Sequence, residues 1–170
     1  MKLPLDLIGL LGSGGLTRGR TGWPAASHSR RDRACEKARS VRRSAAAAAL
    51  PRCDIIFEGL PEILALKQEA FVEASRLAGA DPIIASTTST ILVDDLAGSI
   101  EHPGRFLNAH WLNPAYLVPL VELSPGQKTD PAVTQQLKTL LESIGKVPVV
   151  CAARPGYIVP RIQAIAMNEA

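Results

Sequence analysis

The pattern of apolar and polar positions divides the chain near residue 50. After that point, short apolar runs alternate with stretches in which apolar residues recur every three or four positions. Short runs are typical of strands buried on both faces of a sheet, whereas the wider spacing is typical of helices with one buried side. Strands that alternate with helices in this way predict an α/β fold with a mainly parallel sheet.

Five short stretches predict strands, and a turn signal at Asn113-Pro114 separates the third from the fourth. A last helix is expected to begin within residues 155–170, after the fifth strand. The predicted strands comprise residues 53–59, 81–87, 105–111, 117–123 and 147–152.

A helix is expected between the first two strands. Pro61 suits the first turn of a helix, Glu62 stands beside it, and Gly79 suits the end. Apolar residues spaced three and four apart give this helix one predicted buried side, which consists of Ile63, Leu66, Ala70, Ala74 and Leu77.

Two later helices also have start signals. A short helix is predicted within residues 90–100, with Ser89 or Thr90 as its N-cap. A longer helix should begin at Asp130 and Pro131, which form an N-cap and N1 pair, and end at the following glycine. Its predicted buried side consists of Val133, Leu137, Leu140, Leu141 and Ile144.

Charge changes at the same boundary as the pattern. Residues 1–50 carry ten Lys or Arg and three Asp or Glu, a net charge of +7, whereas the rest carry nine and thirteen, a net charge of −4. We interpret residues 1–50 as a disordered, solvated, low-complexity segment, distinct from an α/β part at residues 51–170. Two alternatives remain open: an organelle-targeting peptide, against which Asp32 and Glu36 count, and a nucleic-acid-binding arm with Trp23 as its sole aromatic residue.

The cysteines and the apolar runs limit the setting of the protein. Cys35, Cys53 and Cys151 are too few and too scattered for a disulfide framework, and they form no CxxC pair for zinc. No apolar run is long enough to span a bilayer. We therefore expect a cytoplasmic protein with no metal site, and with neither nucleic acid nor membrane as a partner.

Residues 108–123 hold one histidine, His110, and one glutamate, Glu122, in an otherwise uncharged stretch. The two side chains can cooperate only at hydrogen-bond distance, roughly 3 Å, whereas twelve extended residues span about 40 Å. Asn113-Pro114 and Pro119 supply breaks at which the chain would reverse, so that two strands lie side by side and pair the two groups at the edge of the sheet. The residues alone leave two interpretations: a general base oriented by a carboxylate, or a structural histidine beside a strand-end glutamate.

Five stretches in order favour the first interpretation. They are FEGLPEILALKQEAF, ASTTSTILVDDLA, RFLNAHWLNP, PLVELSPG and ESIGKVPVVCAARPGYIVPRI. Together they resemble the NAD-binding domain of the 3-hydroxyacyl-CoA dehydrogenase family, over roughly residues 45–170. The resemblance implies a Rossmann-like fold, NAD as cofactor, and oxidation of the 3-hydroxyl of an acyl-CoA in fatty acid metabolism. In the gulonate branch of the family the substrate carries no coenzyme A.

The resemblance also implies roles for individual residues. His110 matches the family's catalytic histidine, and Glu122 matches the glutamate that orients it. Ser89 matches an active-site serine that touches substrate and cofactor, and Asn113 matches an asparagine near the substrate and the nicotinamide. The residues leave a structural alternative for two of these, with Ser89 as a helix cap and Asn113 as a turn residue.

Four further positions match cofactor contacts of the family. Glu62 and Lys67 match residues beside the cofactor, and the lysine also lies near coenzyme A. The alternative for Glu62 is a charge that interacts with the dipole at the start of a helix, and the alternative for Lys67 is a solvated charge. Gly12 and Gly14 fit the first two glycines of a GxGxxG turn that holds the pyrophosphate, but Thr17 occupies the third position.

Two departures from the family follow from the same comparison. Residues 20–50 contain no β-branched run and no acidic residue at a strand end, so we expect only the second half of the NAD-binding domain and hypothesise a frame-shifted or mis-joined segment. Sequencing the gene around codons 16–50 tests this hypothesis, and an intact reading frame matched by peptides would contradict it. Pro160 stands where many relatives have an asparagine that helps the substrate site.

The family continues beyond the region of resemblance into a helical domain that forms homodimers and closes the substrate cleft. The resemblance implies that this domain is absent here. Two functions are therefore expected: an NAD-dependent 3-hydroxyacyl-CoA dehydrogenase with a small-molecule substrate, or a non-catalytic remnant of one.

Overall fold

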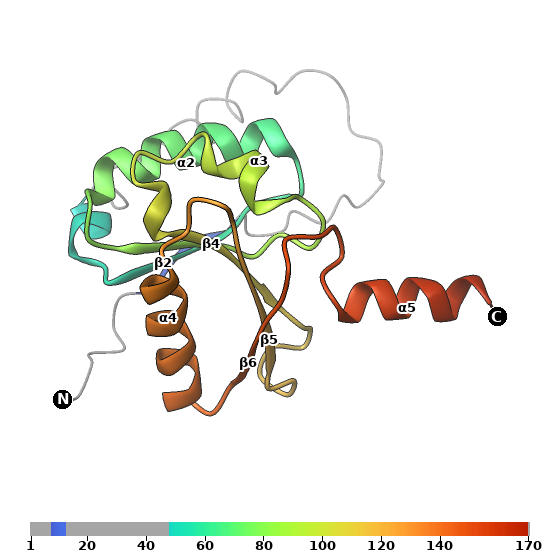
Figure 1. Ribbon diagram of the computed structural model, residues 1–170. Coiled ribbons are helices and arrows are strands. Elements are labelled where there is room, and N and C mark those ends of the chain that lie inside the picture. Colours follow the sequence, from blue (N-terminus) through green and yellow to red (C-terminus); the bar gives the residue numbers. More distant parts are fainter. Residues whose placement is uncertain (1–7, 13–47, 170) are drawn as a thin grey trace, which may run out of the picture.

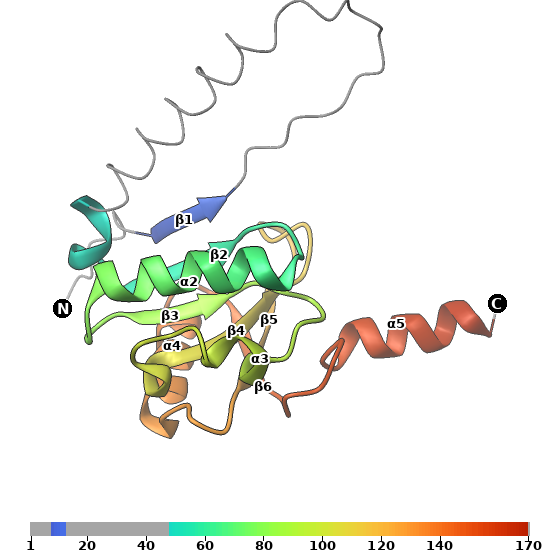
Figure 2. The same cartoon turned by 90° about the horizontal axis from the view of Figure 1, so that it is seen from above.

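The computed structural model describes residues 8–12 and 48–169, which form a six-stranded sheet with helices on both faces (Figure 1). The strands lie side by side in chain order, and every neighbouring pair is parallel except β4 with β5 (Figure 2). The mainly parallel sheet expected from the pattern and the Rossmann-like fold implied by the resemblance are therefore confirmed. The strands are β1 (Ile8–Gly12), β2 (Ile55–Gly59), β3 (Ile83–Ser86), β4 (Phe106–Trp111), β5 (Leu120–Pro125) and β6 (Val147–Val150).

The helices are divided between the two faces of the sheet. Helices α2 (Leu64–Ala78) and α3 (Val93–Ala97) cover one face, and α4 (Pro131–Ser143) covers the other (Figure 1). Helix α5 (Val159–Asn168) extends away from the sheet in both views (Figures 1 and 2). Short 3-10 turns at Leu50–Arg52 and Pro103–Arg105 precede β2 and β4.

Alternate residues of the central strands build two separate cores. Ile56, Ile84 and Phe106 pack under α2 and α3, whereas Phe57 and Leu107 pack against α4. Side chains of a strand point to opposite faces in turn, so a strand that is covered on both faces is apolar at consecutive positions. This arrangement explains the uninterrupted apolar runs in the sequence.

The predicted start of the first helix is wrong, and its predicted buried side is correct only in part. Helix α2 begins at Leu64, after Ile63; Ile63 and Leu66 are exposed, whereas Ala74 is buried and Leu77 packs against the core. The buried residues of the helix are Lys67, Phe71, Ala74, Ser75 and Ala78. The apolar spacing missed this side because a lysine and a serine occupy inward positions, where polar partners satisfy them. The predicted end is correct, because Gly79 caps the helix at a φ of +78°.

Of the caps predicted for the two later helices, the one for α4 is correct and the one for α3 is wrong. Asp130 caps α4 as predicted, since its carboxylate accepts a hydrogen bond from the backbone N of Ala132 at 2.8 Å. Val133, Leu137 and Leu141 of its predicted buried side are buried, and Leu140 is partly buried, but Ile144 is exposed just beyond the last turn. Helix α3 begins at Val93 without a side-chain cap, so the predicted cap at Ser89 or Thr90 is wrong.

Within the described residues, no helix has both the length and the apolar character needed to cross a membrane. Strand β1 lies inside residues 1–50, which were expected to be irregular, and its last residue, Gly12, is the register partner of Gly59. Gly14 and Thr17 lie outside the described residues, as do the remaining expectations for residues 13–47.

Candidate active site

The sheet face beneath α2 and α3 changes from apolar to polar along each central strand. Ile56 is followed on this face by Glu58, Ile84 by Ser86, and Phe106 by Asn108 and then His110. The register places Glu58 opposite Ser86, Ser86 opposite Asn108, and Asn108 opposite Ser124, and all four side chains are buried. A buried row of polar groups therefore crosses four strands, at the carboxyl ends of β2 and β3 and the middle of β4.

His110 and Glu122 pair across the antiparallel strands β4 and β5. They are direct register partners, and Nδ1 of His110 lies 2.8 Å from Oε2 of Glu122. The predicted chain reversal is thus confirmed, and the Asn113-Pro114 peptide bond within it is cis. The expectation that the pair lies at the edge of the sheet is wrong, because β6 pairs with β5. Both β4 and β5 are therefore interior strands.

The second oxygen of Glu122 is also occupied. Oε1 accepts hydrogen bonds from the backbone N of Ile158 and of Val159, both at 2.9 Å, at the start of α5. A carboxylate can only accept, so the hydrogen between the pair belongs to Nδ1 of His110 and the lone pair to Nε2.

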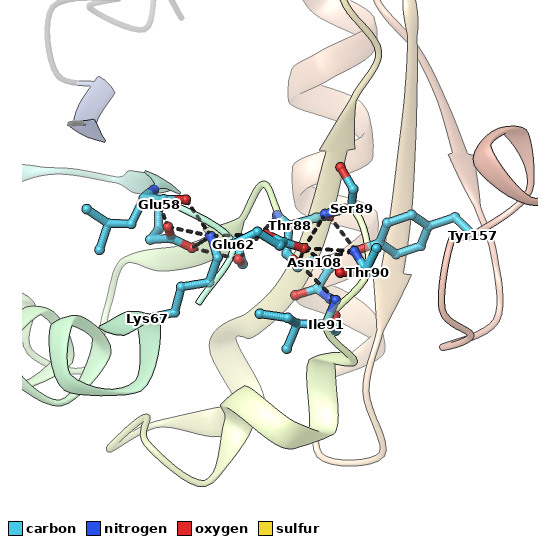
Figure 3. A network of polar contacts seen from close by, with 11 residues as sticks. Glu58, Glu62, Lys67, Thr88, Ser89, Thr90, Ile91, Asn108 and Tyr157 are labelled. Atoms are coloured by element: carbon cyan, nitrogen blue, oxygen red, sulfur yellow. Dashed lines mark hydrogen bonds and ion pairs between the residues drawn. The ribbon is translucent and has the colours of Figure 1, made fainter. Parts of the chain in front are cut away.

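Glu62 fastens the loop between β3 and α3, residues 87–92, which we call the serine loop. Its Oε1 accepts from the backbone N of Ser89 at 3.0 Å, from the N and Oγ1 of Thr90 at 2.9 and 2.8 Å, and from Oγ1 of Thr88 (Figure 3). The hydroxyl of Ser89 points away from these contacts and is exposed. Glu62, on the loop after β2, thus binds the loop after β3. Its alternative role in the first turn of a helix is wrong, because α2 begins at Leu64.

The contacts of Glu62 explain its acidity. Burial opposes ionisation, but hydrogen bonds from Thr88 and Thr90 and the charge of Lys67 outweigh it and lower the pKa of Glu62 to about 2. The group therefore remains a carboxylate, and an acceptor for the serine loop, at any physiological pH.

Lys67 is buried in a charged network with Glu58. Its Nζ lies 2.8 and 3.0 Å from the two carboxylate oxygens of Glu58, 3.0 Å from the carbonyl of Leu60, and 3.7 Å from Oε2 of Glu62 (Figure 3). Ser86 donates its hydroxyl to the same glutamate at 2.7 Å. The alternative of a solvated lysine is therefore wrong, and the network connects β2, β3 and α2 just below the serine loop.

Asn113 is exposed on the loop that joins β4 to β5. Lys146 fastens this loop, because its Nζ donates to the carbonyls of Val118, at 3.2 Å, and of Ala115, and lies 5.5 Å from the centre of the Trp111 ring. A single side chain outside the predicted set, Lys146, therefore contacts this loop at several points.

Tyr157 and Asn108 are site residues that the sequence analysis missed. The ring of Tyr157 stacks on the imidazole of His110, with centroids 5.0 Å apart and planes at 25°, and its hydroxyl donates to the carbonyl of Thr88 at 2.7 Å. Asn108 donates from Nδ2 to the carbonyl of Ile91 at 3.0 Å. No signal in their own neighbourhood marks either residue, because each acts on a loop that is distant in the chain.

Cys151 and metal ions offer no alternative chemistry among the residues described. Burial, and then the charge of Glu122, raise the pKa of Cys151 to about 11, so the side chain remains an unreactive thiol. Nor do residues 8–12 and 48–169 hold any group of three or more His, Cys, Asp or Glu side chains suited to bind a metal.

The fold agrees with the comparisons to known proteins. A family model described as the NAD-binding domain of 3-hydroxyacyl-CoA dehydrogenase matches residues 23–154, and the chain belongs to this family of NAD-dependent oxidoreductases. NAD is the cofactor of the domain.

Three comparisons describe individual relatives. The chain is 33% identical over 123 residues to 5-formyl-3-hydroxy-2-methylpyridine 4-carboxylate 5-dehydrogenase of Mesorhizobium japonicum, covering 72% of this chain and 40% of that protein. A crystal structure of an enzyme described by that activity, an NAD+-dependent dismutase, matches with a TM-score of 0.70 and 32% identity, over 72% of this chain and 40% of the other. The 3-hydroxyacyl-CoA dehydrogenase of Archaeoglobus fulgidus matches with a TM-score of 0.63 and 37% identity, over 69% and 40%. This chain therefore spans about 40% of the length of these relatives.

The described residues fit the nicotinamide end of NAD. In open α/β sheets, ligands bind beyond the carboxyl ends of the strands, and the serine loop and the loop after β2 both lie at that end. Ser89, which is exposed, and His110 lie at the same end of the sheet. The turn after Gly12, where the pyrophosphate would lie, is outside the described residues.

Proposed function

We propose that this chain carries the proton-accepting machinery of a dehydrogenase that oxidises a secondary alcohol. The observation that supports the proposal is the 2.8 Å contact between His110 and Glu122 on interior strands. A histidine held by a carboxylate is a general base, because the carboxylate orients the ring and stabilises the charge that appears when the ring takes a proton.

In this proposal Nε2 of His110 takes the hydroxyl proton of the substrate, and Glu122 stabilises the resulting imidazolium. Ser89 and Asn113 orient the substrate oxygen, since a well-placed reactant removes much of the entropic barrier. When NAD is bound, it supplies the hydride acceptor.

The remaining predicted residues serve the cofactor. Gly12 and Gly14 would hold its pyrophosphate, and Glu62 would act through the serine loop that it fastens. Lys67, whose ammonium is enclosed by Glu58, would shape the cofactor side of the site rather than bind coenzyme A with its charge.

For the substrate, we propose the 3-hydroxyl of an acyl-CoA, as the family's name indicates. A hydroxy acid without coenzyme A is the second candidate, and the pyridine carboxylate named for the Mesorhizobium japonicum relative favours it. We also propose a cytoplasmic location and a homodimer, as in the family, for the whole protein. Oxidation of 3-hydroxybutyryl-CoA but not of 3-hydroxybutyrate or gulonate would support the first substrate, and the reverse would support the second.

A non-catalytic remnant is the alternative function. It is favoured by Thr17, which occupies the third glycine position of the predicted pyrophosphate turn. A side chain there opposes close packing of helix and strand, so cofactor affinity distinguishes a working site from a remnant.

An NADH titration followed by fluorescence or calorimetry makes this distinction. Micromolar binding that is lost in Gly14→Asp would support the dehydrogenase, whereas millimolar or absent binding would support the remnant. In a binding protein, His110→Gln should reduce turnover by roughly 10²- to 10⁴-fold with little change in NADH affinity, because only the proton transfer is removed. His102→Gln, at an exposed histidine on the loop before β4, is the matched control and should retain full turnover.

A further inference from the structure

Tyr157 lies between His110 and the serine loop, two parts of the site that must keep a fixed relative position in the proposed reaction. Its ring is buried and stacks on the imidazole of His110, and its hydroxyl donates to the carbonyl of Thr88 in the serine loop. One side chain thus contacts the proposed base directly and, in the same conformation, donates a hydrogen bond to the loop that carries Ser89. Figure 3 shows Tyr157 beside this loop.

The backbone around Tyr157 is bent to make this contact. Tyr157 has a φ of +42° and follows Gly156 at +72°, and among the described residues it is the sole non-glycine with a positive φ. Bulky residues rarely adopt this conformation, and where they do, the surroundings hold them in it, often at functional sites. Here the surroundings include Glu122, which accepts hydrogen bonds from the backbone N of Ile158 and Val159, immediately after the bend.

Other side chains fasten the serine loop from different directions. Glu62 holds Ser89 and Thr90 from the loop after β2, and Asn108 holds Ile91 from β4. Tyr157 contacts both this loop and the imidazole of His110. It therefore couples the position of the loop to the position of the ring.

We propose that Tyr157 is a positioning residue, which holds the imidazole of His110 and the serine loop in a fixed relation for proton transfer. The inference rests on the proposed function, in which His110 accepts the proton and Ser89 orients the substrate oxygen. The ring acts on His110 by stacking, and the hydroxyl acts on Ser89 through Thr88.

Two substitutions separate the two actions. Tyr157→Phe retains the ring and removes the hydroxyl, whereas Tyr157→Leu removes both. Tyr116→Phe is the matched control, because Tyr116 is exposed on the loop after β4. All three are made in the full chain.

Nuclear magnetic resonance of protein labelled with ¹⁵N-histidine reads the imidazole without any requirement for activity. The chain has three histidines, so the signals of His110 are assigned by their loss in His110→Gln. We expect Tyr157→Phe to leave these signals in place and to speed amide exchange in the serine loop by roughly threefold to tenfold, the effect of one lost hydrogen bond. Tyr157→Leu should speed the exchange equally and also shift the His110 signals.

Kinetics then connect the geometry to the reaction. We expect Tyr157→Phe to lower kcat with little change in the KM for NAD. Its effect should be non-additive with that of Ser89→Ala, because both substitutions affect the contact between Ser89 and the substrate oxygen. Additive effects, or unchanged exchange and unchanged His110 signals in both variants, would overturn the proposal. The expected resonance changes in a protein that oxidises no alcohol would support the positioning and overturn the proposed function instead.

Discussion

At the scale of residues, the site depends on how antiparallel pairing brings two side chains together. Residues directly opposite each other on antiparallel strands have Cβ atoms about 5 Å apart, close enough for an imidazole and a carboxylate to bond without strain. The other oxygen of Glu122 accepts two backbone hydrogens at the start of α5. Both partners are therefore oriented before any substrate arrives, which suits the general base proposed above.

The acidity of Glu62 leads to a prediction at the same scale. Its pKa in the folded chain, about 2, is below the ordinary value of 4.5, so its contribution to stability is complete above about pH 4.5 and is lost as the pH falls toward 2. Glu62→Gln should be less stable than the wild type by about 1 kcal/mol at pH 6, a modest value because the side chain is 38% exposed. The difference should shrink between pH 4.5 and 2 in denaturant titrations.

The matched control for this prediction is Glu69→Gln, on the exposed side of α2. It should leave both the stability and its dependence on pH unchanged. If the effect of Glu62→Gln stays constant from pH 6 to pH 2.5, the hydrogen bonds to the serine loop do not depend on its charge.

At the scale of elements, a buried ion pair joins α2 to the sheet. Lys67 is 1% exposed and Glu58 fully buried, yet every polar atom that they bring inside has a partner from β3, α2 or the loop after β2. Desolvation makes such a pair a weak source of net stability, but the loss of one partner leaves an uncompensated charge. The pair therefore specifies how α2 sits on β2 more than it strengthens the fold.

Lys67→Met should consequently lower the free energy of unfolding by about 3–5 kcal/mol. Adding Glu58→Gln to it should recover part of the loss, since no charge then remains buried, even though each change alone is destabilising. Lys138→Met is the control: its partner Glu142 lies 3.9 Å away at an exposed position, and the cost should stay below about 1 kcal/mol. Equal costs at the two lysines in urea titrations would show that the buried pair is screened like a surface pair.

At the scale of the whole molecule, the sheet and α5 differ in how they are covered. The two cores lie between the sheet and α2, α3 and α4, whereas α5 extends away and buries no side chain within the described residues. Ile162, Ile165 and Met167 are 61%, 63% and 78% exposed on it. Apolar side chains gathered in this way promote association between molecules.

We therefore expect the chain to associate as its concentration rises, and a variant with Ile162→Gln, Ile165→Gln and Met167→Gln to do so less. Because these side chains contribute little to either core, the thermal unfolding midpoint of the variant should be nearly unchanged. Sedimentation velocity measures the association, and Val72→Gln, at an exposed apolar position on α2, is the control. Undiminished association of the triple variant would place the contact surface elsewhere.

Much of the fold could be predicted from the sequence because its signals are local. Apolar runs reveal the strands, Asp130 and Pro131 reveal the start of α4, and the Asn113-Pro114 break reveals the reversal that pairs His110 with Glu122, only twelve positions apart. The five stretches taken together indicate the dehydrogenase family. Each of these features depends on residues close to one another in the chain, so the order of residue types is enough to determine it.

Only the tertiary structure decided the rest of the site. Glu62 reaches a loop 27 positions away, and Tyr157 contacts Thr88 across 69 positions. Such contacts arise when the sheet brings the ends of separate strands together, and a polar side chain does not show in its own neighbourhood which distant partner will satisfy it. The sequence thus determined the class of fold and the pairing of His110 with Glu122, and the packing of the sheet decided how that pair is held.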